Sequence, residues 1–180
     1  MIRNILIRAT LIAATLALSG LLAQPLAAQT DAPSVQVDPP DLQGSRPLEK
    51  QTEAAVIRDY LQSWQSMAAA LDNNQPALLD ADFVGTAHDT LAATVDEQTK
   101  LGIHTRYVAR SHHLQIVFYS PEGLAIQLVD TVAYDEQIFD HDRELISQPV
   151  NARYVVVLTP SEVRWRVRFF QATPPASPAH

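Results

Sequence analysis

Apolar residues recur every three or four positions in the first part of the chain with a folded composition. Within the segment from Leu48 to Leu71, Val56, Tyr60 and Trp64 follow one another at intervals of four. This period places their side chains on one face of a helix. The segment is therefore predicted to form a long amphipathic helix.

Two shorter helices are predicted after the long one. Pro76 suits the first turn of a helix over residues 76–83, because that turn needs no hydrogen bond from the missing proline N–H. A third helix is predicted to open at Gly85, with Ala87 on its apolar face, and to end at Gly102.

Beyond Gly102 the apolar period changes from about 3.6 residues to two, which is typical of strands. Four runs carry this pattern: 107–119, 124–139, 152–159 and 162–171. Three helices followed by a four-stranded antiparallel meander predict an α+β fold, in which a curved sheet wraps around the helices.

The chain is predicted to be exported, and periplasmic or extracellular after processing. Arg3 and Arg8 precede an uncharged run, and Ala28 is the expected cleavage position of a signal peptide over residues 1–28. An uncleaved membrane anchor is the competing interpretation, but Pro25 follows the run before it reaches the roughly 20 residues that a spanning helix needs.

The composition of the remaining chain defines one domain. Residues 29–47 are rich in Pro, Asp, Ser and Gln and are predicted to form a disordered tether, and residues 173–180 a disordered tail. The segment between them, 48–172, has the length of one domain with one core.

Charge and cysteine content exclude several classes of protein. Loss of Arg3 and Arg8 with the signal changes the formal net charge from −7 to −9, and Lys50 and Lys100 are the only lysines. An acidic chain without a basic face argues against nucleic-acid binding. The absence of Cys excludes disulfides, thiolate metal sites and cysteine nucleophiles.

Three segments together resemble the NTF2-like superfamily of cone-shaped α+β domains, which includes SnoaL-like and Tim44-like members. They are the helix bearing Trp64, the segment ALLDADFVGTAHDTL (77–91) and the final strand WRVRFF (165–170). The resemblance covers residues 48–172 and is closest to helix-first domains of translocase and organelle-division proteins. It implies partner or lipid binding. The superfamily also contains cyclases and isomerases that need an acidic residue in the pocket, but no catalytic motif of theirs matches here.

Asp130 is the most informative candidate for chemistry. Its position in the alternation puts it on the core face with Leu128, where a carboxylate is costly unless it is paired or wet. His112 shares the core-facing parity of the preceding strand and could form an acid/base pair with Asp130. The structural alternative is that Asp130 lies at the mouth of the cone or pairs with Arg110 or His112.

Other candidate sites follow from the same patterns. Asp140-His141-Asp142 is predicted to be a solvated turn rather than a metal site, because adjacent residues point apart. No metal and no cofactor are predicted. A small apolar ligand in the cone would contact the inward-facing aromatic and aliphatic residues, unless these only pack in the core. These residues are Tyr60, Trp64, Leu128, Tyr134 and Trp165.

The outer face of the last two strands is predicted to be a protein interface. If the strands pair around Pro160-Ser161, Val157 lies opposite Arg164, Val155 opposite Arg166, and Arg153 opposite Arg168. Arginine mixed with valine, without lysine, is typical of protein interfaces. The alternative is an exposed sheet whose arginine stems cover the valines. The predicted interface consists of Arg153, Val155, Val157, Arg164, Arg166 and Arg168.

These patterns favour an exported, non-catalytic binding or interaction module, either a homodimer or bound to another protein, which could also hold a small apolar ligand. A cyclase- or isomerase-like enzyme that uses Asp130 and His112 is the alternative. Membrane contact is expected only through an uncleaved signal.

Overall fold

The computed structural model describes residues 32–42, 44 and 46–173. The chain divides into two units, Met1–Thr30 and Asp31–His180, and the described residues all belong to the second. The predicted signal peptide or anchor, its cleavage position and residues 174–180 of the predicted tail lie outside the described residues. Among the helices of the described part, none is both long and apolar enough to cross a membrane.

Two α-helices and one short 3-10 helix precede the four long strands: α1 (Lys50–Asn73), η1 (Pro76–Leu79) and α2 (Gly85–Leu101). α1 stops where Asn74 takes a left-handed conformation (φ 54°) and its N–H bonds to the carbonyl of Ala70. α2 ends in the same way at Gly102, with φ 70°. Both ends use a left-handed residue to close the last turn.

The prediction of three α-helices is wrong, because the second one is only a 3-10 turn. The chain after η1 pairs with the last strand instead of continuing as a helix. Val84 N–H donates to the carbonyl of Val167 over 2.9 Å, and Val167 N–H donates to the carbonyl of Asp82 over 2.8 Å. This pairing holds Phe83 beside Val167 in a parallel bridge and covers the free edge of the last strand at that residue.

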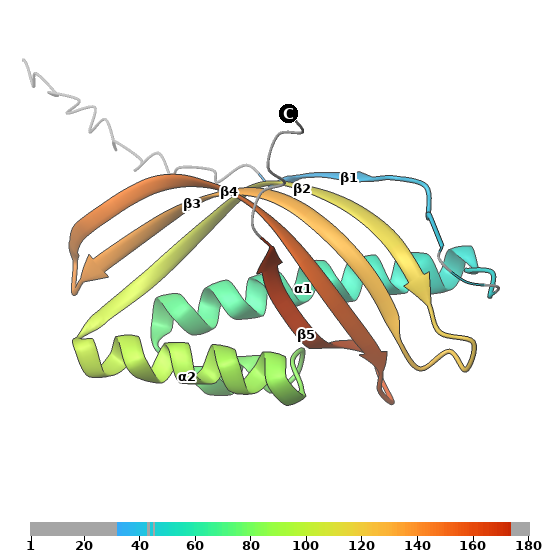
Figure 1. Cartoon of the computed structure of the whole chain (residues 1–180). Coiled ribbons are helices and arrows are strands. Elements are labelled where there is room, and N and C mark those ends of the chain that lie inside the picture. Colours follow the sequence, from blue (N-terminus) through green and yellow to red (C-terminus); the bar gives the residue numbers. More distant parts are fainter. Residues whose placement is uncertain (1–31, 43, 45, 174–180) are drawn as a thin grey trace, which may run out of the picture. The chain divides into compact units, whose positions relative to one another are not determined.

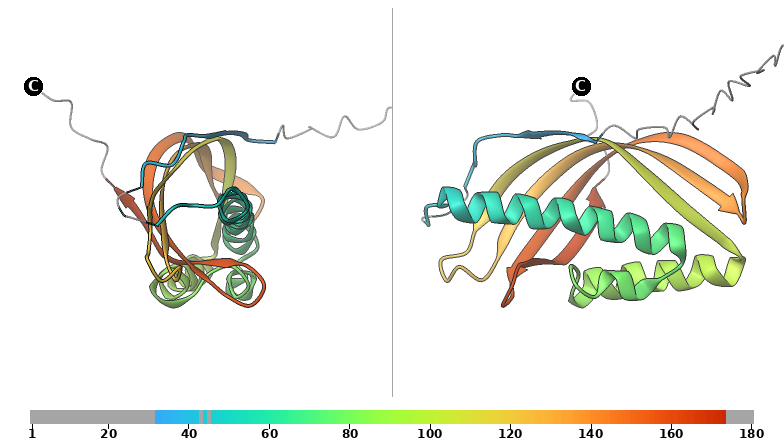
Figure 2. Two further views of the ribbon diagram at one scale, coloured as in Figure 1. Left: turned by 90° about the vertical axis from the view of Figure 1, so that its right-hand side faces the viewer. Right: turned by 180° about the vertical axis from the view of Figure 1, so that it is seen from behind.

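Five strands form one curved sheet in the order β1-β2-β3-β4-β5. β1 pairs with β2 in parallel, and the other neighbours are antiparallel. Both helices lie on the concave side of the sheet (Figures 1 and 2). The strands are β1 (Ser34–Val37), β2 (Ile103–Tyr119), β3 (Ile126–Asp140), β4 (Arg143–Pro160) and β5 (Trp165–Thr173).

β1 corrects the prediction of a purely antiparallel four-stranded sheet, and it lies within the segment predicted as a tether. All four of its side chains are exposed, so no burial pattern marks it in the sequence. It is held by backbone pairing with Ser111–Leu114 on the edge of β2. The half of β2 from Ile103 to Arg110 has no strand partner on that side within the described residues.

The core fills the space between the concave face and the helices. The four strands β2 to β5 contribute inward-facing residues, and α1 contributes the stripe predicted from its period. The buried residues include Val56, Tyr60, Trp64, Met67 and Leu71 of α1, Leu79, Phe83 and Val95, and Leu114, Ile116, Ile126, Leu128, Val132, Val156, Leu158 and Val167 of the sheet.

The predicted register of the last hairpin is wrong. Val157 lies opposite Phe169, Val155 opposite Gln171, and Arg153 opposite Thr173. The residues from Ser161 to Arg164 form the connecting turn, closed by Ser161 N–H on the carbonyl of Arg164 at 2.9 Å. A bulge between Val157 and Leu158 then shifts the pairing by one further residue.

Candidate functional site

A chain of hydrogen bonds runs through the core from α1 to the centre of the sheet. Tyr60 and Trp64 lie one turn apart on α1, and Trp64 Nε1 donates to the Tyr60 hydroxyl over 2.7 Å. That hydroxyl donates in turn to Asp130 Oδ2 over 2.8 Å. His112 Nδ1 lies 2.8 Å from the same Oδ2. These four residues are called the Asp130 network below.

The structure therefore brings Asp130 and His112 into contact. They are diagonal neighbours, since His112 lies opposite Val132 and Asp130 lies opposite Leu114. Arg110, the other partner considered for Asp130, binds Asp135 instead, at 2.6 Å.

The Asp130 network is sealed from solvent. Asp130 is 0 % exposed and His112 is 2 % exposed. Burial, followed by the charge of Asp130, raises the pKa of Tyr60 well above its usual range, so the Tyr60 hydroxyl stays a neutral donor. Asp130 Oδ1 is buried without a hydrogen-bond partner. Unpartnered buried carboxylate oxygens are rare in native proteins, which makes Asp130 a candidate for a functional role.

The residues predicted to line a ligand pocket pack against one another. Tyr60, Trp64, Leu128 and Tyr134 are each no more than 5 % exposed, and Trp165 is half-buried. None of these five residues lines any of the four described cavities. These five residues thus belong to the hydrophobic core or pack against it, and a ligand pocket among them stays a prediction.

A second polar cluster lies beside the Asp130 network, on β2, β3 and β4. It consists of Tyr107, Tyr134, Glu136 and Tyr154. The Trp64 ring links the two groups, with centroid distances of 5.9 Å to Tyr134 and 5.6 Å to Tyr154. Of this cluster, only Tyr134 was singled out in the sequence. The alternation that places Tyr134 on the core face also places Glu136 there. On β2, a bulge between Ala109 and Ser111 separates Tyr107 from His112, so the alternation that places His112 does not extend to Tyr107.

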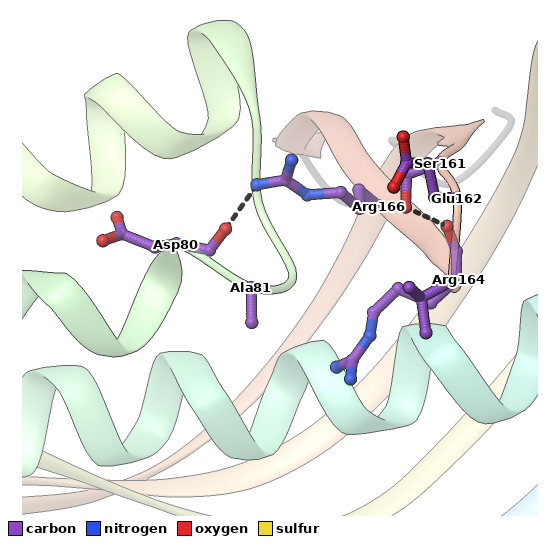
Figure 3. Close-up of a pocket in the computed structure, with 7 residues that line it drawn as sticks. Asp80, Ala81, Ser161, Glu162, Arg164 and Arg166 are labelled. Carbon is purple, nitrogen blue, oxygen red and sulfur yellow. Dashed lines mark hydrogen bonds between the residues drawn. The ribbon is translucent and has the colours of Figure 1, made fainter.

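Two of the arginines predicted for the outer face bind within the chain. Arg164 Nη1 donates to Asp82 Oδ1 over 2.7 Å, and Asp82 is buried. Arg166 Nη2 donates to the carbonyls of Asp80 and Phe83, the latter at 2.9 Å. Figure 3 shows both side chains beside an open surface cavity of about 390 Å³. These hydrogen bonds connect the start of β5 and the turn before it to the segment after η1.

The outer face of the sheet carries both apolar and polar side chains. Val155 and Val157 do lie on this side, opposite Gln171 and Phe169, and Phe169 is 40 % exposed. Residues paired directly across strands share a face, which assigns the neighbouring side chains too. The residues called the outer face below are Gln115, Phe118, Gln127, Val129, Arg153, Val155, Val157, Phe169 and Gln171.

Sequence comparisons give no relatives for this chain. No protein-family model matches it. The search of curated proteins likewise gave no significant match.

The comparison with solved structures, in contrast, does give matches. The intermembrane space region of the chloroplast protein ARC6 aligns with a TM-score of 0.56 at 11% identity, over 71% of this chain and 98% of that chain. A putative scytalone dehydratase from Novosphingobium aromaticivorans aligns at 0.47 and 14% identity, over 70% and 89% of the two chains. The Kfla4162 protein from Kribbella flavida aligns at 0.48 and 9% identity, over 67% and 91%.

At such identities the ARC6 alignment shows a common fold and nothing more. The chain is an α+β domain with a curved, mixed, five-stranded sheet and its helices on the concave face. This architecture is consistent with the NTF2-like cone that its sequence resembles.

Proposed function

We propose that this domain is a non-catalytic binding module that associates with a second copy of itself through the outer face. The observation that carries the proposal is the division between the two sides of the sheet. The concave side is filled, with Asp130 at 0 % exposure. The outer face has apolar residues at its centre and, among the described residues, no helix covering it (Figure 2).

The composition of the outer face favours a second copy over other occupants. Val129, Val155 and Val157 are uncharged, and they are flanked by Gln127 and Gln171. A glutamine amide is both donor and acceptor, so the same residue type can pair with itself across a two-fold axis. Arg153 is the only charged residue of the outer face as defined above, so the central part of the contact would be uncharged.

The test is sedimentation equilibrium of the purified protein over a wide concentration range, comparing wild type with Phe169→Glu. The introduced carboxylate should weaken self-association at least tenfold, because it would be desolvated at the centre of the interface. Val163→Glu is the matched control, since Val163 is 81% exposed in the turn before β5. A wild type that is monomeric at all concentrations would refute the proposal, as would equal effects of the two variants.

An acid/base enzyme is the second candidate, and one observation favours it. His112 Nδ1 faces Asp130 Oδ2 at 2.8 Å, while Asp130 Oδ1 has no partner. A histidine held by a carboxylate through Nδ1 presents its other nitrogen as a base. Native mass spectrometry of protein from its own host tests this: a retained small molecule that disappears in a folded Asp130→Asn variant supports the enzyme, and identical spectra count against it.

A further inference from the structure

β1 is attached to the domain mainly through its backbone. All four of its side chains are exposed, with Val35 at 43 % and Val37 at 39 %, so neither valine is buried in the core. The strand lies along the edge of β2 and pairs in parallel with Ser111–Leu114 (Figure 1). A strand that buries none of its side chains loses little apolar contact when it leaves a sheet, so its detachment costs little free energy. Residues 34–38 are called the strap below.

The chain that follows the strap is fixed to the sheet and to the core. Asp41 N–H donates to the carbonyl of Ile116 over 3.0 Å, and Leu42 packs against the hydrophobic core. Pro39 and Pro40 lie between the strap and this attachment, and their rings restrict the backbone there. The strap can therefore leave β2 while the chain from Asp41 onward stays in place.

An ion pair closes the strap at its C-terminal end. Asp38 N–H donates to the carbonyl of Leu114 over 2.9 Å, and Asp38 Oδ2 lies 2.7 Å from His113 Nε2. Among the described residues, the other side-chain hydrogen bond from the strap to β2 is a long one, from Ser34 Oγ to the carbonyl of Arg110 at 3.5 Å. The side chains of His113 and Asp38 are 45 % and 34 % exposed, so both exchange protons with solvent while the strap is attached.

The other side chains around His113 leave its protonation to solvent and to the strap. Its partners in the neighbouring strands, Gln36 of β1 and Thr131 of β3, are uncharged. Arg153 of β4 lies one strand further, opposite Thr131, and its charge opposes protonation of the imidazole. Two further charged side chains on this side of the sheet bind each other: Arg110 and Asp135.

We propose that the strap is a detachable strand whose attachment to β2 is controlled by the protonation of His113. A protonated imidazole forms an ion pair with the Asp38 carboxylate, whereas a neutral imidazole forms only a weaker hydrogen bond. Histidine is the side chain that ordinarily changes its charge between pH 5 and 8. The strap is thus held more tightly at the acidic end of this range and opens more often at the alkaline end.

Opening of the strap changes the surface in two ways. The backbone groups of Ser111–Leu114 that pair with β1 become a free sheet edge. A cavity of about 310 Å³ beside His113 loses the wall that Ser34 and Gln36 form. The inference does not rest on self-association through the outer face, because it concerns contacts within one chain.

The experiment is amide hydrogen exchange of the purified protein, followed by NMR at pH about 5.5 and about 8, with each rate corrected for the intrinsic rate at that pH. The Asp38 N–H reports on the strap, and amides of β3 report on the centre of the sheet. Asp38 should be less protected than β3 at both pH values, and its protection should fall about two- to fivefold at the higher pH, the range expected for an exposed ion pair. His113→Gln should abolish this fall, because glutamine keeps a donor and carries no charge. His141→Gln is the matched control and should retain it, since His141 pairs with Asp140 in the turn between β3 and β4.

A second variant locks the strap. The sequence has no Cys, so Ser34→Cys combined with Ser111→Cys introduces one pair of thiols at positions that are partners in the parallel register. Oxidation should raise the protection of Asp38 and reduction should return it to the wild-type value. The proposal would be overturned by wild-type protection of Asp38 equal to that of β3, by the absence of a pH effect, by an unchanged pH effect in His113→Gln, or by no rise on oxidation.

Discussion

The Asp130 network can be tested by removing a single oxygen atom, through Tyr60→Phe. The Tyr60 hydroxyl accepts from Trp64 and donates to Asp130, so its loss affects two buried groups at once. Trp64 Nε1 would be left without an acceptor, and Asp130 would keep one donor of two.

The magnitude follows from these two losses. A buried group left unsatisfied costs about 1–3 kcal/mol, and more when it is charged. We expect Tyr60→Phe to lower the free energy of unfolding by about 3–5 kcal/mol, a large part of the stability of a typical domain. Because the shape of the ring is unchanged, no cavity larger than one oxygen contributes to this loss.

Urea unfolding followed by tryptophan fluorescence measures the effect, with an unchanged m-value as the sign of two-state behaviour. Tyr119→Phe is the matched control, since its ring lies beneath Arg46 and its hydroxyl takes no part in the network. A double-mutant cycle with Asp130→Asn should give a coupling energy of about 1–3 kcal/mol. If Tyr60→Phe and Tyr119→Phe were equally stable, the network would not contribute in the way described.

Two further predictions concern the buried phenols and the Arg164 ion pair. The pKa values of Tyr60, Tyr107, Tyr134 and Tyr154 are all raised in the folded state, so the stability that they contribute is fully present below pH about 10 and is lost as the pH rises above it. Tyrosinate absorbance should therefore rise together with unfolding in an alkaline titration, and a rise that precedes unfolding would contradict this. Arg164→Ala should lower the midpoint of thermal unfolding, because it leaves the buried Asp82 carboxylate without its cation. Arg168→Ala, at an exposed position, should change thermal stability by less than about 0.5 kcal/mol, and equal losses in the two variants would argue against the ion pair.

The sequence was informative wherever a hydrophobic period ran without interruption. The stripe from Val56 to Leu71 predicted the buried face of α1. Alternation along β2 and β3 predicted that His112 and Asp130 face the core, because a sheet with one buried face constrains which residues point inward. The contact between Asp130 and His112 could be predicted because β2 and β3 are neighbours both in the chain and in the sheet.

The sequence failed where backbone pairing decided the structure. β1 has four exposed side chains and is defined by its hydrogen bonds to β2. The turn from Ser161 to Arg164 and the bulge after Val157 reset the register of β5, and the position of this bulge is not marked by the hydrophobic pattern. The partners of Arg164 and Arg166 within the chain could not be predicted either, since they lie some 80 residues earlier in the sequence.

The pairing of Asp82–Val84 with β5 also limits how a further strand could add to the sheet. Both backbone groups of Val167 are bonded there, its N–H to the carbonyl of Asp82 and its carbonyl to the N–H of Val84. A strand of another copy that paired along this part of β5 would have to displace the segment that carries Asp82, and with it the hydrogen bond from Arg164. The segment therefore protects β5 at Val167 against edge-to-edge association.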